Sequence, residues 1–458
     1  MRHRVLRHSL GRWVDPAVAY AAVCGAAEHA FWLDSGVHAS AGMSYLGTAA
    51  RVVTTSDFGG SIFDFLRTEL GQTSAETDLE HPGFALGWVG WLGYELRGET
   101  METPVIHSSR YPDAAFLFVD RALAFDHASR EVWLLALADD FGSDSDSDSG
   151  SGWDGELGEW RAETIAQLAA SVAVPVPAVR SRAVATWRYS DDEYLAMIES
   201  CQAAIADGDA YQLCLTTEVS VNVSPDPFTT YLALRESSPT HHGALIRVGG
   251  VSLLSSSPEQ FLSVSPGGVV ETKPIKGTRP RAVLPADDAA LRSELVNSEK
   301  ERAENLMIVD LMRNDIGRIS LVGTVSVPSL LAVESYAQVH QLVSTVRGQL
   351  AQGVTGLDAV ISCFPAGSMT GAPKRSATAI LDRLEKRARG IYSGVFGYFG
   401  LDGSIDLAMV IRSIVIDPAG STVGTGGGIT ALSVPTEELE ETRVKAAALL
   451  AVLGADVR

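Results

Sequence analysis

The sequence has few cysteines and little positive charge. Its 458 residues include four cysteines, Cys24, Cys201, Cys214 and Cys363. Their wide spacing excludes a disulfide framework and any metal site built from closely spaced cysteine pairs. Thirty-six Lys and Arg residues stand against 56 Asp and Glu residues, which gives a net charge of −20. Because a phosphate backbone would be repelled by such a surface, nucleic acid is not an expected partner.

Long apolar runs are also absent. No uninterrupted apolar segment approaches the roughly 20 residues needed to span a bilayer, so no membrane association is expected. Residues 1–13 are basic, but no apolar segment with a small-residue cleavage site follows them, so no signal peptide is expected. Hydrophobic residues make up 46% of the chain, which is enough for a large core. These properties predict a cytoplasmic protein with two domains or one large composite domain.

A low-complexity segment marks one boundary in the chain. Residues 142–152 consist of Gly, Ser and Asp, which cannot bury apolar surface, so a disordered loop is predicted there. We divide the chain into a first region, residues 1–184, and a second region, residues 185–458. Long strand-like runs with helices between them, rather than regular βαβ repeats, predict an α+β fold.

Several elements have recognisable limits. Ser190 and Glu193 form a capping-box pattern that opens a helix. A long helix is predicted with Leu306, Val309 and Met312 at core spacing. The predicted helices cover residues 160–172, 190–206, 287–315 and 437–453, and the predicted strands cover residues 114–120, 131–138, 211–223, 242–256, 268–272, 394–399, 405–416 and 422–425.

Lys276 is the candidate nucleophile. It lies close in sequence to three other cations, Lys273, Arg279 and Arg281. Neighbouring positive charge and burial both disfavour a charged lysine, and a neutral lysine amine is a nucleophile. The alternative, a solvated lysine in a basic loop, stays open on these residues alone.

Two pairs of glutamates are candidate metal ligands. Glu301 and Glu304 are three residues apart on the predicted long helix, and Glu438 and Glu441 have the same spacing on the last helix, where Lys445 shares their face. Carboxylates that converge from two helices suit a hard divalent cation. Solvated helix surfaces produce the same spacing, so both interpretations remain open.

Three further segments suit a ligand site. The glycines of residues 424–428 could present bare backbone N–H groups to a carboxylate, or form a flexible turn. The small residues of 364–374 suit the close approach of a ligand. Glu259 ends a predicted strand, and a carboxyl group near apolar residues could act as a general acid; an exposed loop glutamate is the alternative.

The order and wording of these motifs resemble the chorismate-utilising enzymes. The resemblance rests on residues 255–261, 271–281, 299–318, 364–374 and 426–445 and covers residues 185–455. The first region, at residues 32–35 and 87–94, is similar to the amino-terminal part of the aminating members. The resemblance implies an α+β fold like that of anthranilate synthase component I, with large antiparallel sheets in a two-subdomain β-sandwich core flanked by helices.

Two positions indicate a branch of the family. Members that add water to chorismate have a lysine base where this chain has Gln212. Lysine at the position of Lys276 is typical of aminodeoxychorismate synthases, whereas anthranilate synthases usually have alanine there. The resemblance therefore implies conversion of chorismate and ammonia to 4-amino-4-deoxychorismate, for para-aminobenzoate and folate, with anthranilate synthase component I as the alternative. Gln341, preceded by His340, replaces a histidine of anthranilate synthases, which fits an enzyme that keeps the enolpyruvyl group.

The resemblance also implies roles for individual residues. Lys276 would be the covalent nucleophile and Glu259 the acid. Glu304 and Glu441 would bind Mg²⁺, with Glu301 and Glu438 beside them through water. Substrate binding is expected from the remaining motif positions, which are Gln212, Thr278, Ser368, Tyr392, Arg412, Gly426, Gly428 and Lys445. Because no segment resembles a class I glutaminase, a separate glutaminase subunit is the expected partner. Whether residues 32–35 bind tryptophan or only pack in the core stays open.

Overall fold

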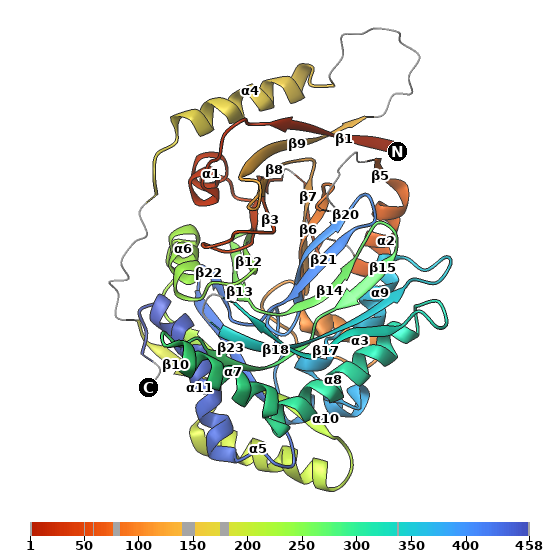
Figure 1. Ribbon diagram of the computed structural model, residues 1–458, viewed down its shortest axis with the longest axis vertical. Helices are drawn as coiled ribbons and strands as arrows, with labels where there is room; N and C mark the ends of the chain where they lie inside the picture. Colours follow the sequence, from red (N-terminus) through yellow and green to blue (C-terminus); the bar gives the residue numbers. More distant parts are fainter. Residues whose placement is uncertain are drawn as a thin grey trace.

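The structure is a computed structural model that describes residues 2–49, 51–57, 59–76, 83–139, 152–174, 183–336 and 339–456. Two large sheets face each other and helices cover their outer surfaces (Figure 1). Among the described residues, all the paired strands are antiparallel except β1 (Arg2–Ser9) and β5 (Ser74–Glu76), which are parallel. The α+β prediction is confirmed. Apart from Gly152, the predicted disordered loop at residues 142–152 lies outside the described residues.

The first sheet has 13 strands from both regions of the sequence. In spatial order they are β10 (Ala185–Trp187), β11 (Gln212–Val221), β23 (Gly420–Ile429), β22 (Ser413–Asp417), β13 (Val251–Ser257), β12 (His242–Val248), β2 (Ala30–Asp34), β3 (Met43–Thr48), β8 (Arg121–Asp126), β9 (Glu131–Asp139), β1 (Arg2–Ser9) and β5 (Ser74–Glu76), with β19 (Gly371–Ala372) beside β11.

The second sheet has ten strands. Their order is β16 (Ile275–Pro280), β18 (Val339–Gln349), β15 (Val269–Thr272), β14 (Gln260–Val264), β21 (Ile405–Met409), β20 (Val395–Gly400), β6 (Gly87–Leu92), β7 (Ala114–Val119) and β4 (Arg51–Thr54), with β17 (Ser326–Ser335) beside β18. The two sequence regions share both sheets, since β2 pairs with β12 and β6 pairs with β20.

Helices pack on the outer faces of the sheets. Apolar side chains of α1 (Pro16–Val23), α4 (Gly155–Ala170), α6 (Pro227–Ser237) and α11 (Pro435–Val452) form a core with the first sheet. Those of α2 (Ile62–Gln72), α8 (Glu299–Gly317) and α9 (Gly356–Cys363) do the same on the second sheet. The helices α5 (Asp191–Ala206) and α10 (Lys374–Glu385) pack against β11. The remaining helices are α3 (Arg97–Met101), α7 (Pro285–Asn297) and the 3-10 turns η1 (Tyr94–Leu96) and η2 (Gly367–Met369).

Strand β6 shows how the sandwich interior forms. Val89 and Trp91 point into the core between the sheets, whereas Trp88 and Leu92 join the core under the helices. Successive side chains on a strand point to opposite faces, and both faces of this strand are buried. The strand is therefore apolar throughout, apart from its glycines, rather than alternating with polar residues.

Several sequence predictions need correction. The helix expected over residues 287–315 is two helices, α7 and α8, which meet at Ser298. Leu306 is exposed, while Val309 and Met312 are buried as expected. The glycines at 424–428 form neither a loop nor a turn but lie within β23. The capping box at Ser190 is confirmed.

The segment that the tryptophan question concerned is part of the core. Trp32 is fully buried and stacks on Tyr20, with ring centroids 5.7 Å apart. The Asp34 carboxylate forms an ion pair with the Arg235 guanidinium, with Oδ2 and Nε 2.8 Å apart. These contacts give the segment a clear packing role.

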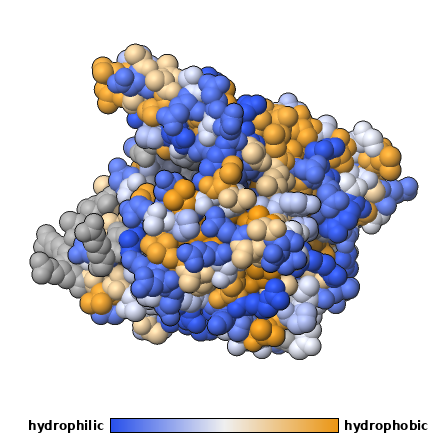
Figure 2. Space-filling view, turned by 90° about the horizontal axis from the view of Figure 1, so that it is seen from below, coloured by the Kyte–Doolittle hydropathy of each residue, from blue (hydrophilic) through white to orange (hydrophobic). Residues whose placement is uncertain are grey.

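The polar character of the surface agrees with the many charged residues of the sequence. The face seen from below is mostly hydrophilic, with hydrophobic residues scattered between the polar ones (Figure 2). Among the described residues, no helix combines the length and the apolar character that a membrane crossing requires.

The glycines of β23 generate a prediction. An added Cβ at Gly424 would lie 2.1 Å from the ring of Tyr392, whereas at Gly427 it would meet only the flexible end of Glu438, at 3.1 Å. Gly424→Ala should therefore lower the free energy of unfolding by about 1–3 kcal/mol, and Gly427→Ala by clearly less. Urea unfolding followed by circular dichroism measures both, and equal losses would contradict this packing.

Candidate active site

A cavity of about 480 Å³ opens where α8, α11, β16, β18 and β23 converge. The predicted site residues that line it are Glu259, Lys276, Thr278, Glu301, Glu304, Ser368, Tyr392, Arg412, Gly426, Gly428, Glu438, Glu441 and Lys445. Gln212 does not line it but lies beside Gly428, since a Cβ added to that glycine would be 2.3 Å from the Gln212 Nε2. The fold therefore brings together residues that are far apart in the sequence.

The surroundings of Lys276 differ from the sequence expectation. Its side chain is largely buried, and its Nζ lies 3.7 Å from Glu304 Oε2. The cations expected to repel charge on Lys276 are themselves paired: Lys273 with Glu271, Arg279 with Glu301 and Glu294, and Arg281 with Asp288. The argument from neighbouring positive charge does not hold in the fold. Lys276 instead lies against a carboxylate at the wall of the cavity.

The glutamates of α8 and α11 face the same cavity. The spacing of three residues places both members of each pair on one helix face. Each carboxylate pairs with one cation: Glu301 with Arg279 at 2.8 Å, Glu304 with Lys276 at 3.7 Å, Glu438 with Lys300 at 3.3 Å and Glu441 with Lys445 at 2.8 Å. Sequence reasoning missed Lys300, although it lies four residues before Glu304 on α8.

Burial and these pairs set the protonation of the carboxylates. Burial raises the pKa of Glu304, and Lys276 and Lys300 only partly oppose it. Burial also acts to raise the pKa of Glu441, but the charge and hydrogen bond of Lys445 outweigh it and lower that pKa. The two predicted metal ligands therefore differ in their readiness to ionise.

The glutamates provide the oxygen ligands that a hard divalent cation prefers. Glu301 Oε2 is buried and has no hydrogen-bond partner, which leaves it available to a cation. In the described part of the chain, however, no three acidic, histidine or cysteine side chains converge closely enough to hold a metal ion. The donor chemistry fits Mg²⁺, whereas the present positions are those of separate ion pairs.

Glu259 is a buried carboxyl group in the cavity wall. It follows β13 and is 8% exposed. Burial raises its pKa to about 7, against the lowering effects of a hydrogen bond from Ser368 and the charge of Lys276. A carboxyl group with this pKa is partly protonated at neutral pH and can donate a proton.

Arg412 is the free cation of the cavity. Its side chain makes no hydrogen bond or ion pair among the described residues, although desolvation by the surrounding protein lowers its pKa. The ring of Tyr392 packs against Gly424 nearby. An unpaired guanidinium in a cavity suits a ligand carboxylate.

The glycine strand forms one wall of the site. Residues 424–429 pair with β11 on one edge, while the pairing with β22 ends at Val423. The other edge of this stretch therefore lies beyond the β22 register, in the cavity wall. Lys445 Nζ donates to the carbonyl oxygen of Gly426 at 3.0 Å.

Gln341 and His340 are separated by the fold. Gln341 lines the cavity. The ring of His340 is buried elsewhere, between Asp288 at 3.0 Å and the hydroxyl of Ser335 at 2.8 Å. His340 therefore does not replace the histidine expected of anthranilate synthases at position 341.

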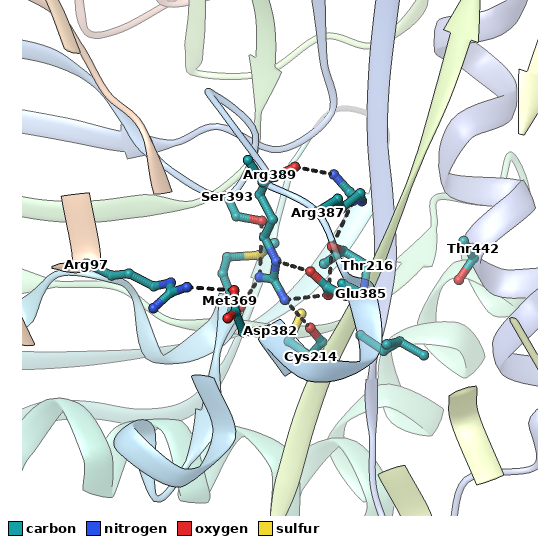
Figure 3. Close-up of polar contacts among 12 residues, drawn as sticks. Arg97, Cys214, Thr216, Met369, Asp382, Glu385, Arg387, Arg389, Ser393 and Thr442 are labelled. Atoms are coloured by element: carbon teal, nitrogen blue, oxygen red, sulfur yellow. Dashed lines mark hydrogen bonds and ion pairs between the residues drawn. The ribbon is translucent and has the colours of Figure 1, made fainter. Parts of the chain in front are cut away.

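Sequence reasoning missed a buried ion pair behind the cavity. Arg389 and Glu385 are 1% and 3% exposed and 2.7 Å apart (Figure 3). Arg389 also donates to the carbonyl oxygens of Met369 at 2.6 Å and Cys214 at 2.8 Å. Met369 and Cys214 line the cavity. The two residues are ordinary i, i+4 charges in the sequence, so no motif distinguished them from a surface pair.

The chain is similar in sequence to known proteins. Residues 28–451 match the family model for chorismate binding enzymes. The chain is 41% identical to an aminodeoxychorismate synthase of Streptomyces griseus over 99% of its length, and spans 64% of that relative. It is 36% identical to an anthranilate synthase component 1 of Streptomyces coelicolor, over 95% of this chain and 86% of that one.

A solved structure agrees with the fold. The anthranilate synthase component I of Streptococcus pneumoniae superposes with a TM-score of 0.76 and 27% identity, covering 96% of this chain and 98% of that one. The α+β sandwich implied by the sequence resemblance is thereby confirmed. The chain belongs to the chorismate binding enzyme family.

Proposed function

We propose that this chain aminates chorismate at C4 to give 4-amino-4-deoxychorismate. The observation that carries the proposal is the meeting of Lys276, Glu259 and the unpaired Arg412 in one cavity of about 480 Å³. We propose that amination proceeds by two successive displacements on the ring. These need a nucleophile, an acid and a group that binds the anionic substrate. The identity to an aminodeoxychorismate synthase supports it.

Chorismate carries two carboxylates, and the cavity offers separate groups for them. The enolpyruvyl carboxylate is assigned to Arg412, whose planar fork matches a carboxylate. Tyr392, Thr278 and Ser368 line the same space, with the edge of β23 at Gly426 and Gly428. The ring carboxylate then faces the glutamates of α8 and α11, which would repel it without a cation.

Mg²⁺ is proposed as that cation. Glu304 and Glu441 would hold it, with Glu301 and Glu438 alongside through water. When bound, it supplies positive charge that neutralises the ring carboxylate and the electron density shifted toward it.

The first displacement uses Lys276 and Glu259. The neutral Nζ of Lys276 attacks C2 of the ring, the double bonds shift, and the C4–oxygen bond breaks. Glu259 gives its proton to the departing hydroxyl group, which leaves as water, and becomes a carboxylate. The lysine nitrogen is then a secondary ammonium joined to C2.

The second displacement uses ammonia. Its lone pair forms a bond to C4, the double bonds shift back, and the C2–nitrogen bond breaks with its electron pair on Lys276, which is again a neutral amine. C4 now carries an ammonium group, and Glu259 regains a proton from solvent. Two displacements retain the configuration at C4.

Ammonia is proposed to come from a glutaminase partner. All four cysteines are buried, and burial raises the pKa of each thiol. A buried thiol of raised pKa is a poor nucleophile for amide hydrolysis.

The domain division at residue 184 and a cytoplasmic location remain predictions of the sequence.

Anthranilate synthesis is the second candidate, favoured by the 36% identity to an anthranilate synthase component 1. The protein should be incubated with chorismate, Mg²⁺ and ammonium, and its product identified by mass spectrometry. We expect an aminated product that keeps the enolpyruvyl group, because Lys276 directs ammonia to C4. Fluorescent anthranilate formed without an added lyase would overturn the proposal.

Lys276→Ala should lose amination by about a hundredfold or more while still binding chorismate. Lys273→Ala is the matched control, since Lys273 belongs to the same segment and pairs with Glu271. Wild-type protein quenched in acid without ammonium should carry a chorismate-derived mass on the Lys276 peptide. Unchanged turnover in the Lys276 variant would exclude the covalent role.

The pKa of Glu259 predicts an alkaline limit to the rate. The acid is active when protonated, so turnover should fall as pH rises through about 7. Glu259→Gln cannot donate the proton and should be slower by about 10²–10⁴-fold, with that limb gone from the pH profile. A profile that keeps the same limb in the variant would assign it to another group.

A further inference from the structure

We propose that Arg389, with Glu385, is a positioning residue that holds the wall of the cavity around Glu259 and Tyr392. The reaction that Arg389 would serve rests on the proposed function, whereas its positioning role rests on the hydrogen bonds that it makes. Neither residue lines the substrate space beside the predicted nucleophile, acid and metal ligands. Their effect passes through the residues they hold.

Arg389 joins three segments that build the site. Its Nη1 donates to the carbonyl oxygen of Met369 in η2, and its Nη2 to that of Cys214 in β11, at 2.6 and 2.8 Å. A longer contact of 3.5 Å reaches the hydroxyl of Ser393, the residue after Tyr392. When a backbone carbonyl in the cavity wall is held in place, the side chains of the neighbouring residues are also held in place.

The guanidinium has no freedom to leave this position. Its Nε and Nη2 donate to the two oxygens of Glu385 at 2.8 and 2.7 Å. Its own backbone N–H and that of Gly390 donate to Glu95 at 2.8 Å each. The planar guanidinium of Arg389 offers its N–H groups in the directions of the Glu385 carboxylate and of the carbonyl oxygens of Met369 and Cys214. The Arg389–Glu385 pair therefore orients the cavity wall as well as neutralising charge.

The link to the acid runs through η2. Met369 follows Ser368, whose hydroxyl donates to Glu259. Fixing the Met369 carbonyl therefore fixes the position from which Ser368 reaches the carboxyl group. Lys276 and Arg412 line the same cavity as Glu259, and among the described residues neither forms a hydrogen bond or ion pair with Arg389.

Arg389→Lys tests the proposal. Lysine keeps the charge that pairs with Glu385, but its single ammonium has no planar fork and cannot hold both carbonyl oxygens in the same geometry. We expect turnover at saturating chorismate and ammonium to fall about tenfold or more. Because the Ser368 hydrogen bond favours the ionised carboxyl group, its loosening should move the alkaline limb of Glu259 to higher pH.

Arg97→Lys is the matched control. Arg97 is 4% exposed and forms an ion pair of 2.8 Å with Asp382, also on α10, but it contacts neither wall carbonyl (Figure 3). Arg97→Lys should lower the free energy of unfolding in urea by about as much as Arg389→Lys. Its turnover and the alkaline limb of its pH profile should stay as in the wild type. Equal changes of turnover and limb in the two variants would reduce Arg389 to a structural role.

Hydrogen–deuterium exchange separates this proposal from the proposed function. In Arg389→Lys, peptides that cover residues 212–217 and 364–374 should exchange faster than in the wild type and in Arg97→Lys. If the wild type makes no aminated product, the proposed function fails and exchange alone decides the positioning role. Unchanged exchange in both peptides would overturn it.

Discussion

The close approach of β23 to β11 and to Tyr392 is the constraint on which the site depends. A Cβ at Gly424 would meet the Tyr392 ring, one at Gly426 the carbonyl oxygen of Leu215 at 2.3 Å, and one at Gly428 the amide of Gln212. Side chains on this strand would push those groups apart. With glycine in place, the strand backbone forms a wall of the cavity and the opposite groups keep their positions.

Charge balance is the second constraint. Five glutamates line the cavity, and the four on α8 and α11 are each paired with a separate cation from β16, α8 or α11. Pairing offsets part of the cost of burying the carboxylates. Arg412 has no partner among the described side chains, so an anionic ligand meets one free guanidinium rather than uncompensated positive charge throughout the cavity.

The sequence predicted the residue types of the site better than their surroundings. Glutamates three apart on a helix share a face by geometry alone, and the motifs of residues 255–281 and 426–445 are long enough to indicate the family and its α+β fold. The break at Ser298 was missed because the apolar spacing of α8 continues the pattern of a single helix. The exposure of Leu306 was missed for a related reason. The spacing of apolar residues indicates which helix face they share, but not whether another element covers that face.

Long-range partners were beyond the reach of the sequence. Lys276 was expected to lie among repelling cations, but Arg279 and Arg281 turn to carboxylates of α7 and α8, which only the fold brings near. Arg389 and Glu385 have the spacing of a surface pair, and their burial depends on β11 and η2 packing over them. Local pattern determines which groups are available, whereas tertiary packing determines their partners.

Gln212 and Lys276 illustrate how two positions that look independent in the sequence are coupled in space. The Gln212 Nε2 and the Lys276 Nζ lie 2.3 and 3.6 Å from the point that a Cβ of residue 428 would occupy. A lysine at position 212 would therefore bring a second ammonium group beside Lys276 in a partly buried site, where like charges repel strongly. A neutral amide at position 212 avoids that repulsion and leaves Lys276 as the one amine group close to residue 428 among the described residues. The residue at 212 thus sets the charge beside Lys276, and the two positions form one local environment rather than two independent ones.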